Sequence, residues 1–476
     1  MSLLERAART DAKPWHLRTS EPDLREELQP SPAGPVTDDA FTGRTLPHIG
    51  AGRTRQTIRL GLDIGGVFFD GQRRAGEVFS MNTRFDAKPV VIVSHPDHVK
   101  SLFANQELAP SVTGESPVRP IVGLSVLTAN GAHHRRQRRL LMPPFHGEAI
   151  AAYRDQIREA TARELDAWPT GQPFSLAPAA QAITLDVIMA GIFGIEGELT
   201  EAEARLRERI RWLLRQSMNP IALVGELINA GKPEPMGILK WALNYVDRAV
   251  YEVIAQRRTE HVPGQRNDIL SLLFDARDED GEGLTDQELR NELLTLVLAG
   301  HETTANTIAW AFERLLRHPA AYDRLRDEAR SDDGAEYVDA TIHESMRVRP
   351  VVPVIGRRVT VPWRFGDVVA PQGSRILVGV VLTHHRPDLY PDPFRFDPAR
   401  FMGVKPSTSA WLPFGGGTRR CLGAALAMEE MRIVVSEIAR RTDLAVTDEE
   451  PERPAHRNVT MIPGKGGRVV ATTVRS

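Results

Sequence analysis

The residues best suited to chemistry surround the only cysteine of the sequence. Cys421 lies in the segment FGGGTRRCLG, from Phe414 to Gly423, within a chain of 476 residues. A phosphate-binding loop ends in Lys and then Ser or Thr, and a dinucleotide-binding loop needs a third glycine where Arg420 stands, so neither fits. A zinc site needs several Cys or His ligands at short spacing, which this segment lacks. A nucleophilic cysteine and an inert, buried cysteine both remain open.

The neighbours of this cysteine favour a thiolate that binds a metal in a flat cofactor. The three glycines 415–417 let the backbone approach a flat, bulky group closely. Amides of such a loop, and the positive end of the helix that AALAMEEMRIVVSEIARR predicts directly after it, stabilise a thiolate. Arg419 could pair with a carboxylate of the cofactor. These features suit the axial ligation of haem iron by Cys421.

The same segment carries a family resemblance. It matches the haem-binding pattern of the cytochrome P450 family, Phe-x-x-Gly-x-Arg-x-Cys-x-Gly, at Phe414, Gly417, Arg419, Cys421 and Gly423. The resemblance implies haem b (iron protoporphyrin IX) as cofactor, with Cys421 as the axial ligand of the iron and the other matched residues beside the haem.

A second candidate site is AGHETT, residues 299–304. A zinc-protease helix would need a second histidine where Ala305 stands, and a glycine next to threonines predicts a weakened, functional stretch of helix. The segment resembles the oxygen-binding helix of the P450 family. That resemblance implies that Glu302 and Thr303 are the catalytic acid–alcohol pair, which delivers protons for cleavage of the O–O bond. Ala299 would leave room beside the haem.

A third motif is ATIHESMRVRP, in which Glu344 and Arg347 are three residues apart and therefore share a helix face. The P450 family places this pair inside the fold, bonded to an arginine of a later segment that is present here as DPARF. The resemblance implies a structural network of Glu344, Arg347 and Arg400 that holds the cysteine loop.

The segment GAHHRRQRRLLMPPFHG is rich in basic residues. A solvated basic helix face explains it without any ligand. The P450 resemblance implies that His134 and Arg138 bind haem propionates, because the bidentate geometry of arginine suits carboxylates. It also implies Arg357 as a propionate partner, with Arg358 as a rival and His385 as a weaker candidate.

Several elements must position these residues. Helical periodicity prevails from about 130 to 350, and 285–288 form a capping box that predicts the start of one helix running to about His318, before Pro319. Residues 88–100 read as a strand followed by a helix start, Phe365-Gly366-Asp367 as a turn between strands, and 464–467 as the turn of a hairpin. The sequence predicts a mainly α fold with small β-sheets, and the resemblance places the haem between the long central helix and the cysteine loop.

Composition limits the remaining possibilities. A net charge of −2 gives no bulk electrostatic reason to bind nucleic acid, and a single cysteine cannot form an internal disulfide. The apolar stretch 176–195 contains Gln181 and Asp186 and reads as a core helix rather than a membrane span. We expect a cytoplasmic monomer without a membrane anchor, with residues 1–45 as a poorly ordered lead-in and 46–476 as a single domain.

The resemblance implies a monooxygenase that activates O2 and inserts one oxygen atom into a hydrophobic small molecule such as a fatty acid, terpenoid, steroid or polyketide. The expected pocket loops, at about 103–130, 218–235, 351–355 and 458–460, are mainly apolar. Electrons would come from a separate ferredoxin- or flavodoxin-type partner with its reductase, docked near Arg135, Arg139 and Arg420. Two alternatives stay open: an enzyme that uses or isomerises peroxide at a haem thiolate, and a non-catalytic haem- or ligand-binding protein.

Overall fold

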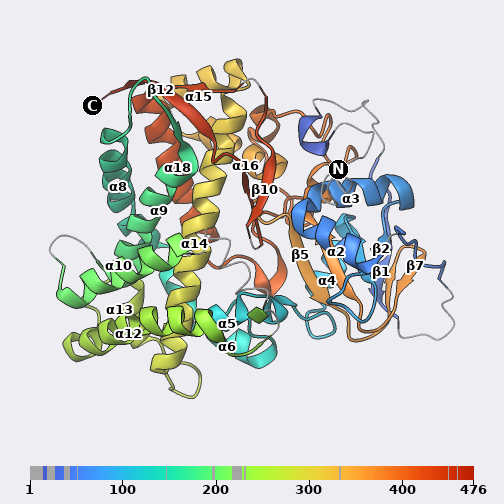
Figure 1. Cartoon of the computed structure of the whole chain (residues 1–476), viewed down its shortest axis with the longest axis horizontal. Helices are drawn as coiled ribbons and strands as arrows, with labels where there is room; N and C mark the ends of the chain where they lie inside the picture. Colours follow the sequence, from blue (N-terminus) through green and yellow to red (C-terminus); the bar gives the residue numbers. More distant parts are fainter. Residues whose placement is uncertain are drawn as a thin grey trace.

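The structure is a computed structural model. It describes residues 14–18, 27–36, 43–50, 52–145, 147–195, 199–216, 228–229, 232–331, 334–448, 450–457 and 459–475. Most helices gather on one side of the molecule, and the sheets that contain β2, β5 and β7 lie on the other side together with α2, α3 and α4 (Figure 1). The predicted mainly α architecture with small sheets is therefore confirmed.

The described helices are α-helices, from the 4 residues of α5 to the 30 residues of α14, and short 3-10 turns. In chain order they are η1 (Trp15–Leu17), α2 (Arg53–Leu62), α3 (Ile64–Ala75), α4 (Pro96–Ala104), η2 (Thr113–Glu115), α5 (Arg119–Val122), α6 (Gly131–Leu141), η3 (Pro143–Phe145), α7 (Glu148–Ala152), α8 (Arg154–Asp166), α9 (Leu176–Phe193), α10 (Glu201–Gln216), α12 (Gly237–Glu260), α13 (Ile269–Asp275), α14 (Asp286–Leu315), α15 (Pro319–Arg330), α16 (Glu336–Val348), α17 (Val380–His384), η4 (Pro398–Phe401), η5 (Gly417–Arg419) and α18 (Ala424–Arg441).

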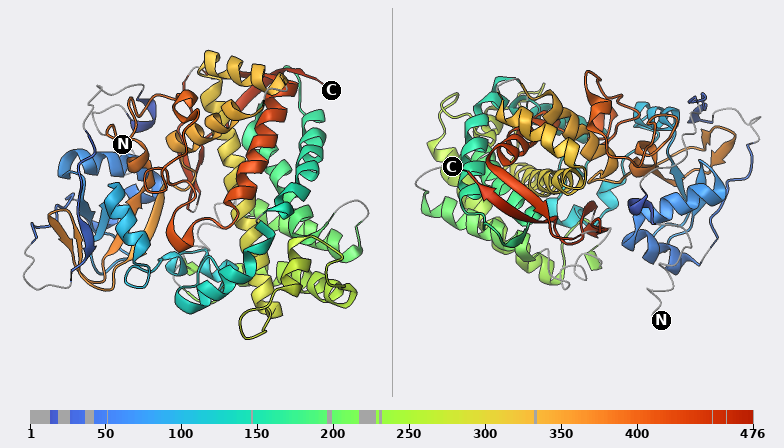
Figure 2. Two further views of the ribbon diagram at one scale, coloured as in Figure 1. Left: turned by 180° about the vertical axis from the view of Figure 1, so that it is seen from behind. Right: turned by 90° about the horizontal axis from the view of Figure 1, so that it is seen from above.

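The long helix α14 forms the axis of the helical side (Figure 2). It starts at the predicted capping box, in which the Thr285 side chain accepts from the amide of Glu288 and the Glu288 carboxylate accepts from the amide of Thr285. Its 30 residues give a length of about 45 Å. The helix runs unbroken through 299–304, so the predicted weak stretch does not end it.

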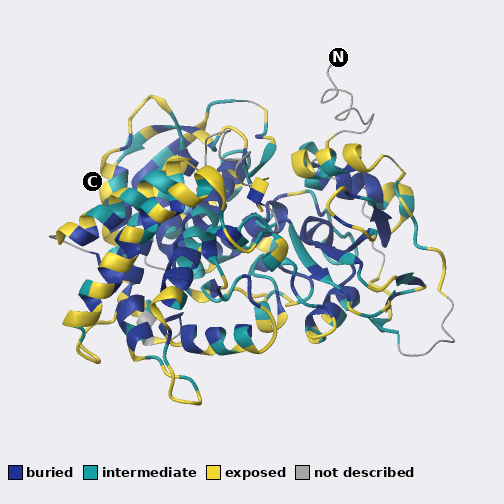
Figure 3. Ribbon diagram, turned by 60° about the horizontal axis from the view of Figure 1, so that its bottom comes forward, coloured by how far each residue is buried: buried dark blue, intermediate teal, exposed yellow. Residues whose placement is uncertain are grey.

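The core is built around α14. Ile308 and Phe312 of α14 pack with Ile183 of α9 and Ile438 of α18 in one buried cluster. By length and composition α9 could span a membrane, yet 72% of it is buried within the protein. Figure 3 shows buried positions along the inward sides of these helices and exposed ones along their outer sides. As the sequence predicts, α9 is a core helix.

The strands form four small sheets. Their orders are β2-β3-β8-β5, β1-β6-β7, β4-β12-β9 and β10-β11. The strands are β1 (Ala33–Pro35), β2 (Phe79–Met81), β3 (Val90–Val93), β4 (Pro173–Ser175), β5 (Val354–Arg358), β6 (Trp363–Phe365), β7 (Val368–Ala370), β8 (Arg375–Gly379), β9 (Thr442–Val446), β10 (Pro454–Arg457), β11 (Thr460–Pro463) and β12 (Arg468–Val474).

Two predicted turns have different outcomes. Gly366, with φ of 60°, turns the chain between the antiparallel strands β6 and β7, as predicted. The predicted hairpin around 464–467 is wrong, because β11 pairs with β10 whereas β12 pairs with β4 and β9. Gly466 and Gly467 adopt positive φ, and their carbonyls accept from the amides of Ala177 and Leu176, so the chain leaves one sheet and enters another.

Part of the expected lead-in packs on the rest of the chain. Trp15 is buried, and the guanidinium of Arg349 lies 5.2 Å from its ring centroid. Strand β1 pairs with β6. The other expected lead-in residues, 1–13, 19–26 and 37–42, lie outside the described residues, as do 218–227, 230–231 and 458 of the expected pocket loops.

Candidate active site

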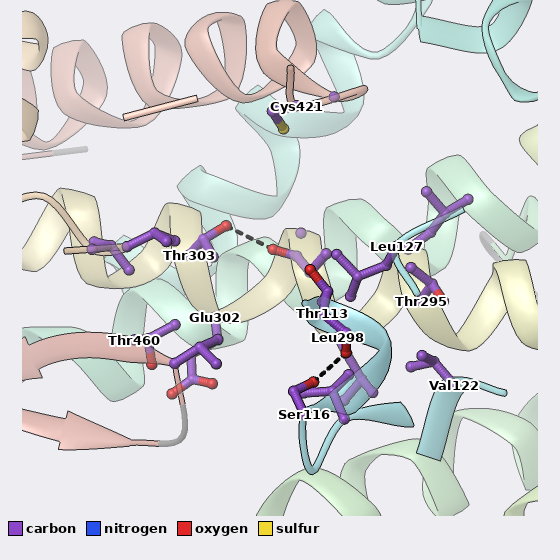
Figure 4. Close-up of a pocket in the computed structure, with 18 of the residues that line it drawn as sticks. Thr113, Ser116, Val122, Leu127, Thr295, Leu298, Glu302, Thr303, Cys421 and Thr460 are labelled. Atoms are coloured by element: carbon purple, nitrogen blue, oxygen red, sulfur yellow. Dashed lines mark hydrogen bonds between the residues drawn. The ribbon is translucent and has the colours of Figure 1, made fainter. Parts of the chain in front are cut away.

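A cavity of about 1500 Å³ lies between α14 and the loop that carries the single cysteine. The Cys421 sulfur points across the cavity toward the stretch of α14 that contains Thr303 (Figure 4). Thr303 and Cys421, 118 positions apart in the sequence, therefore lie on facing walls of one cavity.

The glycines of the cysteine loop answer to steric demands on both of its sides. Gly415 and Gly417 have φ of 64° and 63°, a region that other residues rarely adopt. A Cβ on Gly416 would lie 2.5 Å from the ring of Phe103, and one on Gly417 would lie 2.8 Å from the carbonyl oxygen of the same residue. The loop thus packs closely against α4, and Gly416 and Gly417 make this contact possible.

The rest of the motif lies as its pattern requires. The amide of Cys421 donates to the carbonyl of Phe414 over 2.8 Å, which closes the loop. Phe414 lines the cavity and packs edge-on against Trp411. Gly423 is the residue directly before α18, so this helix begins next to the sulfur.

The Cys421 thiol is exposed toward the cavity but lies deep in the protein. Burial raises its pKa, whereas the amide of Gly423 and the cations Arg420 and Arg138 act in the opposite direction. The expected stabilisation of a thiolate by the loop is therefore outweighed by burial. A metal ion at the sulfur would remove the proton outright.

A group of basic side chains, which we call the cation cluster because three of them are arginines, lines the cavity beside the cysteine loop. It consists of His134, Arg138, Arg357 and Arg419. Burial and, after it, the neighbouring arginines lower the pKa of His134 to about 4, so this ring is neutral at pH 7 and the arginines carry the charge of the cluster. Burial and then Arg419 lower the pKa of Arg357 to about 10. Among the described residues no carboxylate shifts the pKa of these four side chains, and the one acidic group that acts on them is the Cys421 thiol beside Arg138, so the cluster suits an anionic ligand.

Two members of the cluster show how it is held. The Nε of Arg357 is buried without a partner among the described residues, and its Nη1 donates to the carbonyl of Gly356 over 3.1 Å. Arg419 donates to the carbonyls of Leu127 and Ala129 and to the Asn130 side chain. The orphaned nitrogen and the uncompensated charge are the features expected where two propionates bind, and the residues present therefore fit haem.

The alternatives to these cations point elsewhere. Arg358 pairs with Glu115 and Asp86 instead of lining the cavity. His385 donates to the carbonyl of Val381, and its ring packs among aromatic side chains of the core. Of these three candidates, the cavity contains Arg357 alone.

The expected acid–alcohol pair is split. The Thr303 hydroxyl donates to the carbonyl of Ala299 over 2.6 Å, whereas the Glu302 carboxylate turns toward β10 and β11 and pairs with Arg457 over 3.1 Å (Figure 4). Burial raises the pKa of Glu302, and Arg457 and Thr460 oppose this shift. In this conformation Glu302 cannot pass a proton directly to Thr303.

Two small residues of α14 leave space, Ala299 for the cavity and Gly300 for helix α9. Ala299 is exposed toward the cavity, as expected for a position that leaves room beside the haem. A Cβ on Gly300 would lie 2.7 Å from Cδ1 of Ile188, so this glycine also permits the close packing of α14 against α9.

The network of Glu344, Arg347 and Arg400 is present and buried. Arg347 donates to both carboxylate oxygens of Glu344, over 2.6 and 2.8 Å, and both side chains are fully buried. Arg400 donates to Glu344 over 3.1 Å. Arg347 also donates to the carbonyls of His384 and Pro393, so the network ties α16 to the segments that precede the cysteine loop.

One hydrogen-bonded residue of this network, His384, was not predicted from the sequence. His384 accepts from the amide of Leu412, at the start of the cysteine loop, with its Nε2 over 2.8 Å. Its Nδ1 lies 3.1 Å from the carbonyl of Arg347 and must therefore carry the proton. Burial lowers the pKa of His384 to about 3. A neutral histidine thus joins the buried network to the loop that carries Cys421.

Comparison with known proteins decides the family. The cytochrome P450 family model matches residues 47–470. The chain belongs to the cytochrome P450 family. A Mycobacterium tuberculosis relative named cytochrome P450 138 is 39% identical over 84% of this P450 and 89% of its own length. Another relative from Mycobacterium bovis, named cytochrome P450 135B1, is 37% identical over 85% of this chain and 86% of its own.

Solved structures show the same fold. The retinoic acid-bound cyanobacterial CYP120A1 superposes with a TM-score of 0.71 at 23% identity, over 91% of this P450 and all of that chain. The crystal structure of CYP102L1 superposes with a TM-score of 0.74 at 21% identity, over 91% of this chain. The protein is a cytochrome P450 monooxygenase, and its family implies a haem cofactor. Bacterial members of the family generally use ferredoxin-type redox partners.

Proposed function

We propose that this P450 hydroxylates or epoxidises a hydrophobic small molecule, with haem b held by Cys421. The observation that carries the proposal is the cavity itself, where a lone sulfur faces Thr303 of α14 and the cation cluster lines the side. Haem, when bound, supplies the oxidising chemistry. The chain supplies the sulfur ligand, the cations for the propionates and the walls.

Each part of the cavity has a stated task in this proposal. His134, Arg138, Arg357 and Arg419 hold the propionates. The Thr303 hydroxyl would hold a proton at the part of the cavity that faces Cys421, and Glu302 would pass protons from solvent toward it after leaving Arg457. Apolar side chains from α12 and from the segment before β5 line the remainder, among them Leu239, Val351 and Val352. Such a lining favours fatty acids, terpenoids, steroids or polyketides over polar metabolites.

The electron partner is proposed to be a ferredoxin- or flavodoxin-type protein that docks near the cysteine loop. Arg420 is exposed there, whereas Arg135 and Arg139 are ion-paired with Glu107 and Glu279. We therefore expect Arg420→Glu to slow electron transfer from an acidic ferredoxin more than Arg135→Glu does, in stopped-flow reduction at low ionic strength. Equal rates for both variants and the wild type at every salt concentration would remove Arg420 from the docking surface.

The deciding experiment uses the purified, haem-loaded protein. We expect the reduced wild-type protein to bind CO with the spectrum of thiolate-ligated haem, and Cys421→Ser to lose that spectrum and the oxidation of dodecan-1-ol. Thr303→Val serves as the control, because it should keep the thiolate spectrum while it uncouples O2 consumption from product. A Cys421→Ser protein that kept both spectrum and product would refute the proposal.

The peroxide-using alternative is separated by the oxidant. The proposal requires turnover with NAD(P)H, a reductase and ferredoxin, and little turnover with hydrogen peroxide alone. An enzyme that uses peroxide can dispense with proton delivery, so the presence of Glu302 and Thr303 argues for O2 as the oxidant. Full activity with peroxide and none with redox partners would favour the alternative. Absence of turnover with either oxidant across a panel of apolar compounds would favour a binding protein.

A further inference from the structure

Arg457 stands apart from the cation cluster. It ends β10 and is the register partner of Thr460 of β11. Figure 4 shows Thr460 and Glu302 on one side of α14 and Cys421 on the other. Arg457 lines the same cavity. The arginine at this end of the cavity is thus separated from the residues proposed to hold the propionates.

The ion pair with Glu302 uses only some of the hydrogen-bond donors of Arg457. Its Nη1 donates to Oε1 of Glu302 over 3.1 Å, and each side chain keeps 22% of its surface exposed. A guanidinium offers five N–H donors, and within the described ranges this is the one acidic partner of Arg457. An anion in the cavity can therefore reach the guanidinium, either beside Glu302 or in its place.

Apolar side chains line the cavity together with Arg457. Leu60 and Ile64 of the first helices and Val351 and Val459 near β10 line the cavity with it. Val459 is 49% exposed. A ligand that satisfies this arrangement has one anionic end and a long apolar body.

We propose that Arg457 binds the carboxylate of an amphiphilic substrate, which takes the place of the Glu302 carboxylate. The inference rests on the proposed function and names the substrate class of that same cavity. A bidentate arginine–carboxylate contact is stronger than the single contact that Glu302 makes, so the exchange is favourable. Arg457 is then the residue that selects acids over alcohols and esters of equal length.

The exchange has a consequence for Glu302. Its pKa is raised by burial and held down by Arg457. When Arg457 turns to the substrate, the cation that favoured the carboxylate is lost and an anion arrives nearby, so Glu302 takes one proton from solvent. Charge balances, because one substrate anion and one proton enter together. An acidic substrate thereby creates a protonated acid next to Thr303.

The other titratable groups around Glu302 do not offer a competing site at neutral pH. On α14, burial lowers the pKa of His301 to about 4, and this ring contacts the hydroxyl of Thr184. On β10, burial lowers the pKa of His456, opposed by Asp63. Both histidines are therefore neutral at pH 7 with or without the substrate.

Binding of matched probes to the haem-loaded enzyme tests the inference. We expect dodecanoate to bind at least about 10-fold more tightly than dodecan-1-ol in titration calorimetry at pH 7. Arg457→Gln should weaken dodecanoate about 10- to 100-fold and leave dodecan-1-ol unchanged. Arg375→Gln is the matched control, since Arg375 also lines the cavity but pairs with Asp86 and Glu115.

Glu302→Gln gives an effect of the opposite sign. It removes the competing carboxylate, so dodecanoate should bind more tightly than to the wild type, which mere loss of structure would not produce. In weak buffer with a pH indicator, the wild type should take up about one proton per dodecanoate bound and none with dodecan-1-ol. Glu302→Gln should take up none with either probe.

Equal affinity of the two probes for the wild type, or a preference for dodecanoate that survives Arg457→Gln, overturns the inference. Tighter dodecanoate binding without proton uptake overturns the exchange with Glu302. A wild type with the thiolate spectrum and turnover of dodecan-1-ol but no acid preference refutes this inference alone. A protein without that spectrum refutes the proposed function, and calorimetry still decides the role of Arg457.

Discussion

The strongest test of how the fold holds the cysteine loop is the removal of His384. Its ring accepts from the amide of Leu412 over 2.8 Å and donates to the carbonyl of Arg347 over 3.1 Å, and it is fully buried. His384→Leu leaves both backbone groups buried without partners, at about 1–3 kcal/mol each. We expect a loss of about 2–6 kcal/mol in the free energy of unfolding.

The neighbouring histidine provides the control. His385 is also buried, but it donates to the carbonyl of Val381 within its own turn and contacts the rings of Trp15, Phe69 and Phe394. His385→Leu should therefore cost stability without loosening the cysteine loop. His384→Gln, which keeps one acceptor and one donor, should recover part of the loss.

Two measurements on the same variants complete this test. Urea unfolding gives the free energies, and the CO spectrum of the reduced protein gives the fraction of haem that keeps its thiolate ligand. His384→Leu should lower this fraction and His385→Leu should not. If His384→Leu costs less than about 0.5 kcal/mol, or if both variants lose the thiolate equally, the link through His384 does not position the loop.

Three further outcomes are expected. Gly417→Ala should lower the free energy of unfolding, measured with urea, and the haem content, measured by absorbance. Gly403→Ala is the control and should have smaller effects, because Gly403 also has a positive φ of 64° but a Cβ there would meet open space. Equal effects of the two variants would contradict the close packing of the cysteine loop against α4. Arg357→Gln should speed the transfer of haem to an acceptor apoprotein about 10-fold, whereas Arg358→Gln should not. The free energy of unfolding should fall as the pH drops from 6.5 toward 4, by about 1.4 kcal/mol per pH unit for each histidine that stays neutral when folded but binds a proton when unfolded; a flat profile would contradict this. Histidines of this kind include His98, His301 and His384.

Local patterns in the sequence predicted much of the site. The start of α14 follows from a capping box, because its hydrogen bonds join residues three apart. The positions of Cys421 and Thr303 follow from motifs whose spacing is fixed within a single loop or helix turn. The network of Glu344, Arg347 and Arg400 was predicted through family resemblance, and its geometry agrees.

Contacts between distant segments could not be predicted. Arg457 meets Glu302 across 155 positions, and Leu412 meets His384 across 28, so nothing in either local pattern pointed to the other. The prediction of a hairpin at 464–467 was wrong for the same reason. Its glycines match a hairpin turn locally, but β12 does not pair with the strand before this turn. It pairs with β4, almost 300 positions earlier in the chain, and with β9, from which β10 and β11 separate it.

The bonds of Arg419 have a consequence for how the protein is made. This arginine donates to the carbonyl of Ala129, 290 positions earlier, and to neighbouring groups of the same segment. During synthesis, α6 and its basic residues leave the ribosome long before the cysteine loop does. Until then Arg419, which completes this end of the cavity, is missing. We therefore expect the chain to bind haem only after nearly all of it has been synthesised. The slow closure of such distant contacts sets the interval during which the unfinished cavity stays open to the cell.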